Sequence, residues 1–266
     1  MRLSRPLRTT LGALTIAVLV MIYVPLFVVL VNSFSTSQSL VWPPPGFTLE
    51  WWGKAFQNQG ALSALWTSVQ VATLATLISL VLGTLVAIAL QRYRFFGRQS
   101  VSLLVILPIA LPGIVTGIAL NNAFRTILGL QLGFFTIVVA HATFCIVTVF
   151  NNVQARLRRT GTNLEEASAD LGAGIWTTFR LVTFPQLRSA LFAGGLLAFA
   201  LSFDEIIVTT FTAGVGTTTL PIWIFQNLFR PNQAPVVNVI AVVLVAVSVI
   251  PIYIAQRIAG AERVSK

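Results

Sequence analysis

Residues 156–185 read RLRRTGTNLEEASADLGAGIWTTFRLVTFP, the longest polar stretch of an otherwise apolar sequence, and they hold three of its seven acidic residues. Thr162 and Asn163 are both good helix N-caps. Each has a glutamate three residues later, Glu165 and Glu166, as a capping box requires. The sequence therefore predicts a short helix that begins here, with both glutamates at the positive end of its dipole.

A bend and a second helical segment are expected to follow. Gly172 suits the left-handed residue that ends a helix, and residues 175–181 form a helical segment that runs to Pro185. Two such short helices cannot bury a core of their own, so this hairpin needs a surface to dock on. Arginines flank it on both sides, which favours a cytoplasmic loop between two membrane spans. They are Arg156, Arg158, Arg159, Arg180 and Arg188.

The composition of the whole chain is that of a membrane protein. Of its 266 residues, 56% are hydrophobic and 9% are charged, and the mean hydropathy is +0.87. The polar loops are too short to fold as an independent domain. The chain has no nucleotide-binding lysine loop, zinc-binding helix signature or Gly-x-Ser-x-Gly elbow. We therefore expect no enzymatic activity and no bound cofactor or metal in this chain.

Six apolar runs are long enough to cross a membrane as helices and lack the alternation of a barrel strand. The first run is too long for a secretory signal and has no cleavage site, so it is expected to stay as a span. The sequence thus predicts an all-α membrane protein with a single transmembrane domain over residues 1–266 and a polar loop at 156–190. The six spans are expected at about 11–31, 62–90, 101–124, 134–153, 191–213 and 236–258.

The basic residues are distributed unequally between the two sides of the membrane. Fourteen of the 17 Lys and Arg residues fall on the side of the polar loop, which places both termini in the cytoplasm. The net charge of +10 therefore sets orientation and does not indicate nucleic acid binding. The nine basic residues on this side outside the loop are Arg2, Arg5, Arg8, Arg92, Arg94, Arg98, Arg257, Arg263 and Lys266, and those on the other side are Lys54, Arg125 and Arg230.

Two of the expected spans contain residues that are unusual in membrane helices. Pro108 and Pro112 each remove a hydrogen bond, which predicts a kink or an unwound segment. A moving hinge and a static kink both remain open there. His141 lies one turn before Cys145 in the fourth span. Because zinc needs three or four ligands and the chain has no other His or Cys, we expect His141 to make a hydrogen bond between helices.

The fifth expected span contains two acids, Asp204 and Glu205. Acids at this depth are costly and normally face a cavity or a partner. On a helical wheel Glu205 shares a stripe with Ser202, Thr209 and Thr212, whereas Asp204 lies about 100° away. The stripe predicts the wall of a wet substrate pathway. The alternative is that the acids cap an irregular helix or contact a neighbouring subunit.

The polar loop carries a resemblance to a known family. Glu166-Ala167-Ser168, Gly172 three residues later, and Val182-x-Phe184-Pro185 after nine more resemble the EAA loop of permease subunits of binding-protein-dependent ABC importers. The family pattern is Glu-Ala-Ala, three residues, Gly, nine residues, then Ile-x-Leu-Pro. Three further stretches resemble the second permease of spermidine/putrescine importers, and they are LPIALPGIVTG (107–117), SFDEIIVTTF (202–211) and TTTLPI (217–222).

The resemblance implies a type I ABC importer fold of the MetI-like kind in the bacterial inner membrane. It implies a heterodimer with a second permease, two copies of a cytoplasmic ATPase that binds ATP and Mg, and an extracytoplasmic polyamine-binding protein. The loop would be a coupling helix that inserts into a groove of the ATPase. The residues expected to serve this coupling are Glu165, Glu166, Ala167, Ser168, Asp170, Gly172 and Pro185.

Three other interpretations are weighed against this one. A self-contained secondary transporter or channel for small cations would use Asp204 and Glu205 as its ion site. An intramembrane hydrolase would need a nucleophile motif beside His141. The hairpin could also lie on the lipid surface as an amphipathic element. The presence of a coupling-type loop favours the importer permease over all three.

Overall fold

The computed structural model describes residues 5–39, 41–230 and 232–264, with side chains described for 7–39, 41–230 and 232–249. Arg2, Lys266 and the side chains of Arg5, Arg257 and Arg263 lie outside this part. The chain forms two compact units. One contains the described residues up to Leu62 together with Ile224–Ile254, and the other contains Ser63–Trp223 and the described end from Ala255.

The first unit contains helices α1 (Arg5–Asn32) and α2 (Glu50–Gln57) and the start of α12 (Ala234–Val264). Helix α1 exposes its apolar side chains along nearly its whole length. The loop between α1 and α2 is ordered by two contacts, a β-bridge between Ser35 and Phe47 and a hydrogen bond of 2.8 Å from Trp51 Nε1 to the carbonyl of Ser35.

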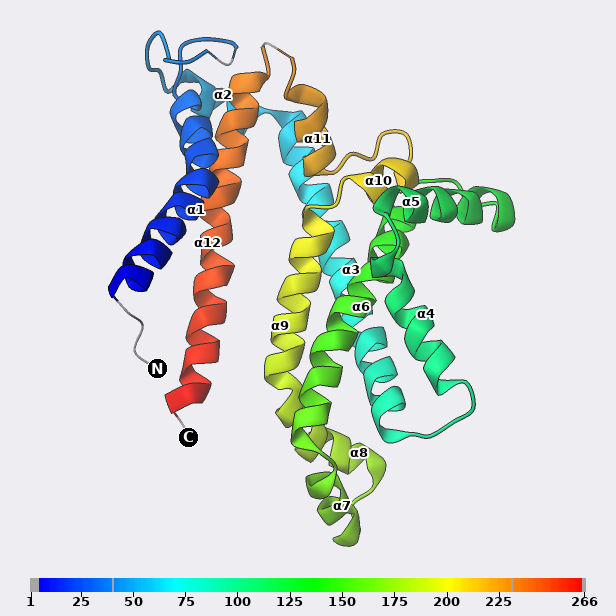
Figure 1. The fold of residues 1–266 in the computed structure, drawn as a ribbon. Helices are drawn as coiled ribbons and strands as arrows, with labels where there is room; N and C mark the ends of the chain where they lie inside the picture. Colours follow the sequence, from blue (N-terminus) through cyan, green and yellow to red (C-terminus); the bar gives the residue numbers. More distant parts are fainter. Residues whose placement is uncertain (1–4, 40, 231, 265–266) are drawn as a thin grey trace. The chain divides into compact units, whose positions relative to one another are not determined.

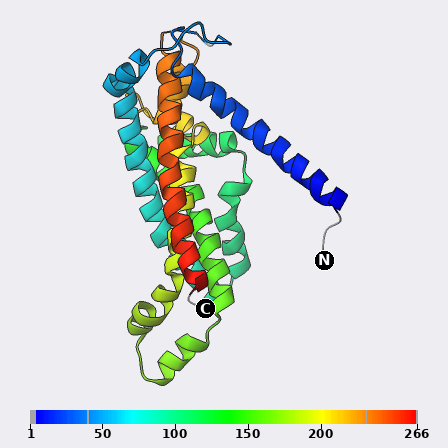
Figure 2. The same cartoon turned by 90° about the vertical axis from the view of Figure 1, so that its left-hand side faces the viewer.

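The remaining helices lie mostly in the second unit, with α11 divided between the two units, and Figure 1 labels all of them except η1 and η2. They are α3 (Gln59–Arg92), α4 (Arg98–Ala110), α5 (Gly113–Asn122), the π-helical η1 (Ala123–Ile127), α6 (Phe134–Thr160), α7 (Asn163–Asp170), α8 (Ile175–Thr178), the π-helical η2 (Phe179–Thr183), α9 (Phe184–Phe203), α10 (Ile207–Thr212) and α11 (Leu220–Asn227). In both views α7 and α8 project beyond the end of α6 (Figures 1 and 2).

Helix α6 supplies the centre of the apolar core. Its Val149, Phe150 and Val153 are fully buried, and they cluster with Leu187 of α9. Small residues allow the helices to approach closely at this interface. A Cβ atom on Gly194 of α9 would lie 3.3 Å from the Cα of Val149. Helices α6 and α9 therefore pack closely at this glycine.

The predicted all-α membrane class is confirmed. Four described helices are long and apolar enough to cross a membrane, and a fifth counts if the bent pair Arg98–Ala110 and Gly113–Ile127 is one span. The expected spans at about 11–31, 62–90 and 134–153 fall within α1, α3 and α6. Helix α12 begins near the expected start of the sixth span, and over Ala234–Val249 it is a shorter apolar helix.

The third expected span, about 101–124, is broken at the predicted place. The helix direction bends by 108° between the two halves, Arg98–Ala110 and Gly113–Ile127. Pro112 directly precedes α5, where its missing N–H leaves no helical hydrogen bond unmade, and Pro108 lies near the end of α4. The prediction of a kink is confirmed, and a single straight span is excluded.

The fifth expected span, about 191–213, is wrong at both ends. The helix begins earlier, because α8, η2 and α9 form one run over Ile175–Phe203. Pro185 lies inside this run, so the prediction that a helical segment ends at Pro185 is wrong. The wider turn of η2 comes just before it and accommodates its ring and its missing donor. At the other end the helix stops at Phe203 and resumes only at Ile207.

Candidate functional site

The polar hairpin, defined here as residues 163–183, bends where the sequence predicts. Gly172 has a φ of +82°, in the left-handed region. The amide of Gly172 donates to the carbonyl of Ala169 at 2.8 Å, and that of Ala173 donates to the carbonyl of Ser168 at 3.1 Å. This pair of bonds is the Schellman motif that closes a helix. A hydrogen bond of 3.0 Å between the hydroxyls of Ser168 and Thr178 then joins α7 to α8.

The start of α7 differs from the prediction. Neither Thr162 nor Asn163 caps the helix with its side chain. The backbone carbonyl of Thr162 instead accepts the amides of Glu165 and Glu166, each at 2.9 Å. The predicted capping box is therefore wrong, because the carboxylate of Glu165 is engaged elsewhere.

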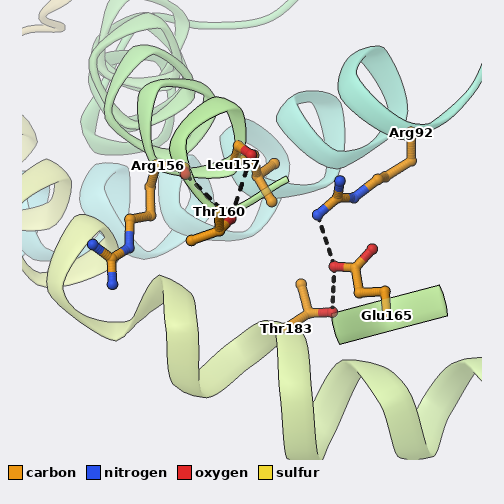
Figure 3. A network of polar contacts seen from close by, with 6 residues as sticks. All are labelled: Arg92, Arg156, Leu157, Thr160, Glu165 and Thr183. Carbon is orange, nitrogen blue, oxygen red and sulfur yellow. Dashed lines mark hydrogen bonds and ion pairs between the residues drawn. The ribbon is translucent and has the colours of Figure 1, made fainter. Parts of the chain in front are cut away.

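Glu165 turns inward and joins three parts of the chain (Figure 3). Its Oε1 lies 2.8 Å from Nη2 of Arg92, at the end of α3, and accepts a hydrogen bond of 2.8 Å from the hydroxyl of Thr183 in η2. The side chains of Arg92 and Glu165 are only 12% and 21% exposed. Because Nε and Nη1 of Arg92 are buried without a partner in the described part of the chain, removing Glu165 would leave a largely buried cation uncompensated.

A further contact ties α6 to the start of α9, just beyond the hairpin. Nε of Arg156, in α6, donates to the carbonyl of Gln186 at 2.9 Å. Beside the ion pair is a cavity of about 290 Å³ whose lining includes Arg92, Glu165 and Phe179. The hairpin itself is thus attached to α3 through Glu165.

The outer face of the hairpin is exposed and carries both acidic and large apolar side chains. Glu166, Ala167 and Asp170 are exposed, as is Pro185 just beyond the hairpin. Leu171, Ile175 and Trp176 are exposed too, at 89%, 85% and 73%. A cluster of large apolar side chains of this kind marks an interaction surface. The structure thus separates the predicted coupling residues, because Glu165 faces the chain's own helices and Glu166 faces outward.

The second candidate site is the break between α9 and α10. The short α10 is held at its carboxyl end by two neighbouring helices. Nδ2 of Asn121 donates to the carbonyl of Phe211 at 2.5 Å. The hydroxyl of Thr136 donates to the backbone carbonyl of Thr212 at 2.8 Å. Helix α5 also lies against α10, since a Cβ on Gly117 would lie 2.7 Å from Cδ2 of Phe211. Six residues of helix are therefore kept in place by side chains that satisfy its last carbonyls.

His141 of α6 contacts both sides of this break. Its Nδ1 lies 2.7 Å from Oγ of Ser202 in α9, and its Nε2 lies 2.8 Å from Oγ1 of Thr209 in α10. All three residues are buried. The predicted hydrogen bond between helices is confirmed, and a neighbouring bond of 3.3 Å joins Cys145 Sγ to the carbonyl of Ala198.

The acids lie in the break itself. Asp204 is exposed and Glu205 is half-buried. Oε1 of Glu205 accepts the amide of Val208 at 2.9 Å, and so Glu205 caps α10. In the described part of the chain the ion pairs are Lys54–Glu50 and Arg92–Glu165, which leaves both acids without a cation.

The predicted stripe of Ser202, Glu205, Thr209 and Thr212 on one helix is wrong, because the helix is interrupted between the first two members. The hydroxyl of Thr212 donates to the carbonyl of Val208 at 2.9 Å. The hydroxyls of Ser202 and Thr209 contact His141 and do not line a wet wall in this structure. Their role toward a substrate stays a prediction, as does hinge motion at Pro108 and Pro112.

Sequence reasoning missed Arg92, Thr183 and Asn121. The sequence indicated only that Arg92 is one of many basic residues on the same side of the membrane, and such a charge does not reveal which acid it contacts. Thr183 and Asn121 are common polar residues near helix ends. Their roles depend on which helices are neighbours, which no local pattern records.

Comparisons with known proteins agree on one family. The family described as "Binding-protein-dependent transport system inner membrane component" matches residues 79–262. The spermidine/putrescine transport system permease protein PotC of Escherichia coli (strain K12) is 33% identical over 249 residues, which cover 93% of each chain. The putrescine transport system permease protein PotI of the same organism is 32% identical over 250 residues, covering 91% of this chain and 88% of PotI.

A solved structure shares the fold. It is that of a bacterial ABC transporter involved in the import of the acidic polysaccharide alginate, and the matched chain gives a TM-score of 0.70 at 15% identity. The match covers 98% of both chains.

Proposed function

We propose a function from one premise: the chain belongs to the family of inner membrane components of binding-protein-dependent transport systems. It is therefore the permease of an ABC importer, a non-catalytic membrane subunit. A self-contained secondary transporter or a hydrolase does not fit this membership. Our proposal concerns what the permease carries and how its parts serve that transport.

We propose that the substrate is a polyamine of the spermidine or putrescine class. The observation that carries this is the pair of acids at the broken helix, Asp204 and Glu205, neither of which is ion-paired in the described chain. A carboxylate in a membrane segment needs a cation or a polar cavity. The ammonium groups of a polyamine would supply that cation during passage. The names of PotC and PotI support the same substrate class.

The assembly that we propose contains a second permease, two copies of a cytoplasmic ATPase that binds ATP and Mg, and an extracytoplasmic polyamine-binding protein. The exposed apolar face around Leu171 and Trp176 would meet the ATPase. With the bent pair and α12 each counted as one crossing, the chain would have six spans, with both termini in the cytoplasm of the bacterium.

The test is transport by the purified assembly in proteoliposomes. Labelled spermidine, putrescine and a neutral acetylated polyamine are supplied with the binding protein, and uptake is followed with and without ATP. We expect ATP-dependent uptake of the two cations and not of the neutral compound. Equal uptake of the neutral compound would contradict a role for the acids, and loss of the ATPase on deletion of 165–172 would support the coupling assignment.

A further inference from the structure

We propose that His141 is a positioning residue for transport, because it holds the interrupted helix in the form that presents Glu205. The proposal rests on the proposed function for its transport readout. It concerns a residue that touches neither the acids' carboxylates nor the outer face of the hairpin. The evidence is the arrangement of three buried side chains and the helix break between two of them.

The imidazole joins two residues that an unbroken helix would keep apart. Ser202 lies in the last turn of α9 and Thr209 lies in α10, seven residues later. In a continuous helix these residues would be about 10.5 Å apart along the axis. One five-membered ring cannot bridge that separation with bonds of 2.7 and 2.8 Å. The contact can therefore exist only while the helix is broken, and it favours the broken form over a continuous one.

The hydrogen-bond pattern assigns the protons of this cluster. The hydroxyl of Thr209 donates to the carbonyl of Glu205 at 2.8 Å, so its oxygen must accept from Nε2–H of His141 at 2.8 Å. In a neutral imidazole Nδ1 is then the acceptor, and the hydroxyl of Ser202 donates to it at 2.7 Å. For neutral His141 the single proton therefore lies on Nε2, and every polar atom of the cluster has a partner.

This chain of bonds ends on the backbone of the acid. His141 donates to Thr209, and Thr209 donates to the carbonyl of Glu205. The carboxylate of Glu205 in turn accepts the amide of Val208. His141 is fixed by its own packing, since it is 1% exposed and its ring lies 5.4 Å from that of Phe144. The position of the acid is therefore set from α6 through one threonine.

The chain offers a matched control for this link. Thr209 and Thr210 are adjacent, and each hydroxyl donates to the carbonyl four residues earlier, at 2.8 Å to Glu205 and 2.7 Å to Ile206. Only Thr209 also contacts His141. The substitutions Thr209→Val and Thr210→Val each remove a hydroxyl and its bond to the carbonyl four residues earlier. Only Thr209→Val also removes the link to His141, and Thr209 is buried whereas Thr210 is exposed.

The first experiment measures polyamine uptake by the reconstituted importer together with its basal ATP hydrolysis. We expect His141→Leu and Thr209→Val to lower the maximal uptake rate by about tenfold to a hundredfold, the range for a displaced functional group. The substrate concentration for half-maximal uptake and the basal ATP hydrolysis should stay the same. Thr209→Ser, which keeps the hydroxyl, should restore uptake, and Thr210→Val should resemble the unmodified protein.

The second experiment does not depend on the substrate. A cysteine replaces the exposed Asp204, and its reaction rate with a charged methanethiosulfonate reagent is measured in the assembled importer, where the buried Cys145 contributes little background. We expect His141→Leu to change this rate by about tenfold or more, the effect of a moved segment on a positioned group. Thr210→Val should leave it unchanged.

The outcomes separate this proposal from the proposed function. If the importer carries no polyamine, or if Glu205→Gln transports normally, the proposed function fails, and the labelling result still decides the role of His141. If Glu205→Gln is defective while His141→Leu transports and labels normally, His141 is not a positioning residue. Loss of basal ATP hydrolysis in His141→Leu with normal hydrolysis and transport in Thr209→Val would also overturn the proposal.

Discussion

Two glutamates of this chain lie beside short helices, and their surroundings are opposite. Glu165 is in the first turn of α7, and its carboxylate is neutralised by Arg92 and bonded to Thr183. Glu205 precedes α10, and its carboxylate accepts one backbone amide and no cation in the described chain. The difference shows that the first charge serves the chain's own architecture, whereas the second has no cation within the described chain and is available for the incoming cation that we propose.

The largest effect is expected at Gly172, which closes the hairpin that holds Glu165. We expect Gly172→Val to abolish transport. A β-branched residue at a φ of +82° is strained by about 1–2 kcal/mol. The strain arises from the backbone alone, because an added Cβ would meet no atom within 4 Å. The measurement is ATP-dependent uptake beside substrate capture by the binding protein, which should be intact. Normal uptake would show that the bend is dispensable.

The unpaired charge is tested next, by Glu205→Gln. The amide keeps an oxygen that can cap Val208, and it removes only the charge. We expect polyamine uptake to fall by about tenfold to a hundredfold, the worth of a hydrogen bond to a charged group. Assembly with the ATPase and basal ATP hydrolysis should survive. If Glu205→Gln and Asp204→Asn both take up polyamine at the full rate, the acids do not serve the substrate. A variant that fails to assemble would support the capping interpretation.

The paired charge is tested by reversal. Arg92→Glu and Glu165→Arg each place like charges together, whereas the double variant restores an ion pair with the opposite polarity. We expect each single variant to lower the ratio of uptake to ATP hydrolysis several-fold, and the double variant to recover most of it. Because both side chains are largely buried, each single reversal leaves a buried charge without its partner, and the second reversal compensates it. Equal defects in the single and double variants would mean that Glu165 acts on a partner and not on Arg92.

The smallest expected effect concerns the link within the hairpin. Ser168→Ala removes one hydrogen bond, to Thr178, that is half-buried. A net loss of about 1 kcal/mol or less should lower uptake by no more than about fivefold. Thr177→Ala is the matched control, because Thr177 is an exposed neighbour of Thr178. A larger effect at Ser168 than at Gly172 would place the critical contact between the two short helices and not in the bend.

The sequence anticipated those features that depend on residues close together in the chain. The left-handed turn at Gly172 follows from glycine's tolerance of positive φ. The break at Pro112 follows from a missing amide. His141 was expected to bond to another helix because a lone histidine cannot hold a metal. Each inference needed only a residue type and its immediate neighbours.

The features that were missed depend on the pairing of distant helices. The interruption after Phe203 contains neither proline nor glycine, and an apolar run on both sides hides it from any hydropathy window. At the break, Glu205 accepts the amide of Val208, which a continuous helix would bond internally, and His141 bonds to the side chains of Ser202 and Thr209 on either side. Likewise, nothing near Arg92 indicates that it meets Glu165. A signal was available only for Glu205, as an acid three residues before the amide that it caps.

The continuous helix from Ile175 to Phe203 has a mechanical consequence. Its first end contains Thr178 and Thr183, which bond to Ser168 and Glu165, and its last turn contains Ser202, which bonds to His141. From Thr183 to Ser202 the axis measures about 28 Å. A helix of this length without a proline kink in its middle is stiff, so we expect a torque applied at the polar hairpin to turn Ser202 as well. A twist driven by ATP at one end would thereby strain the imidazole contact at the other without any chain of intervening side chains.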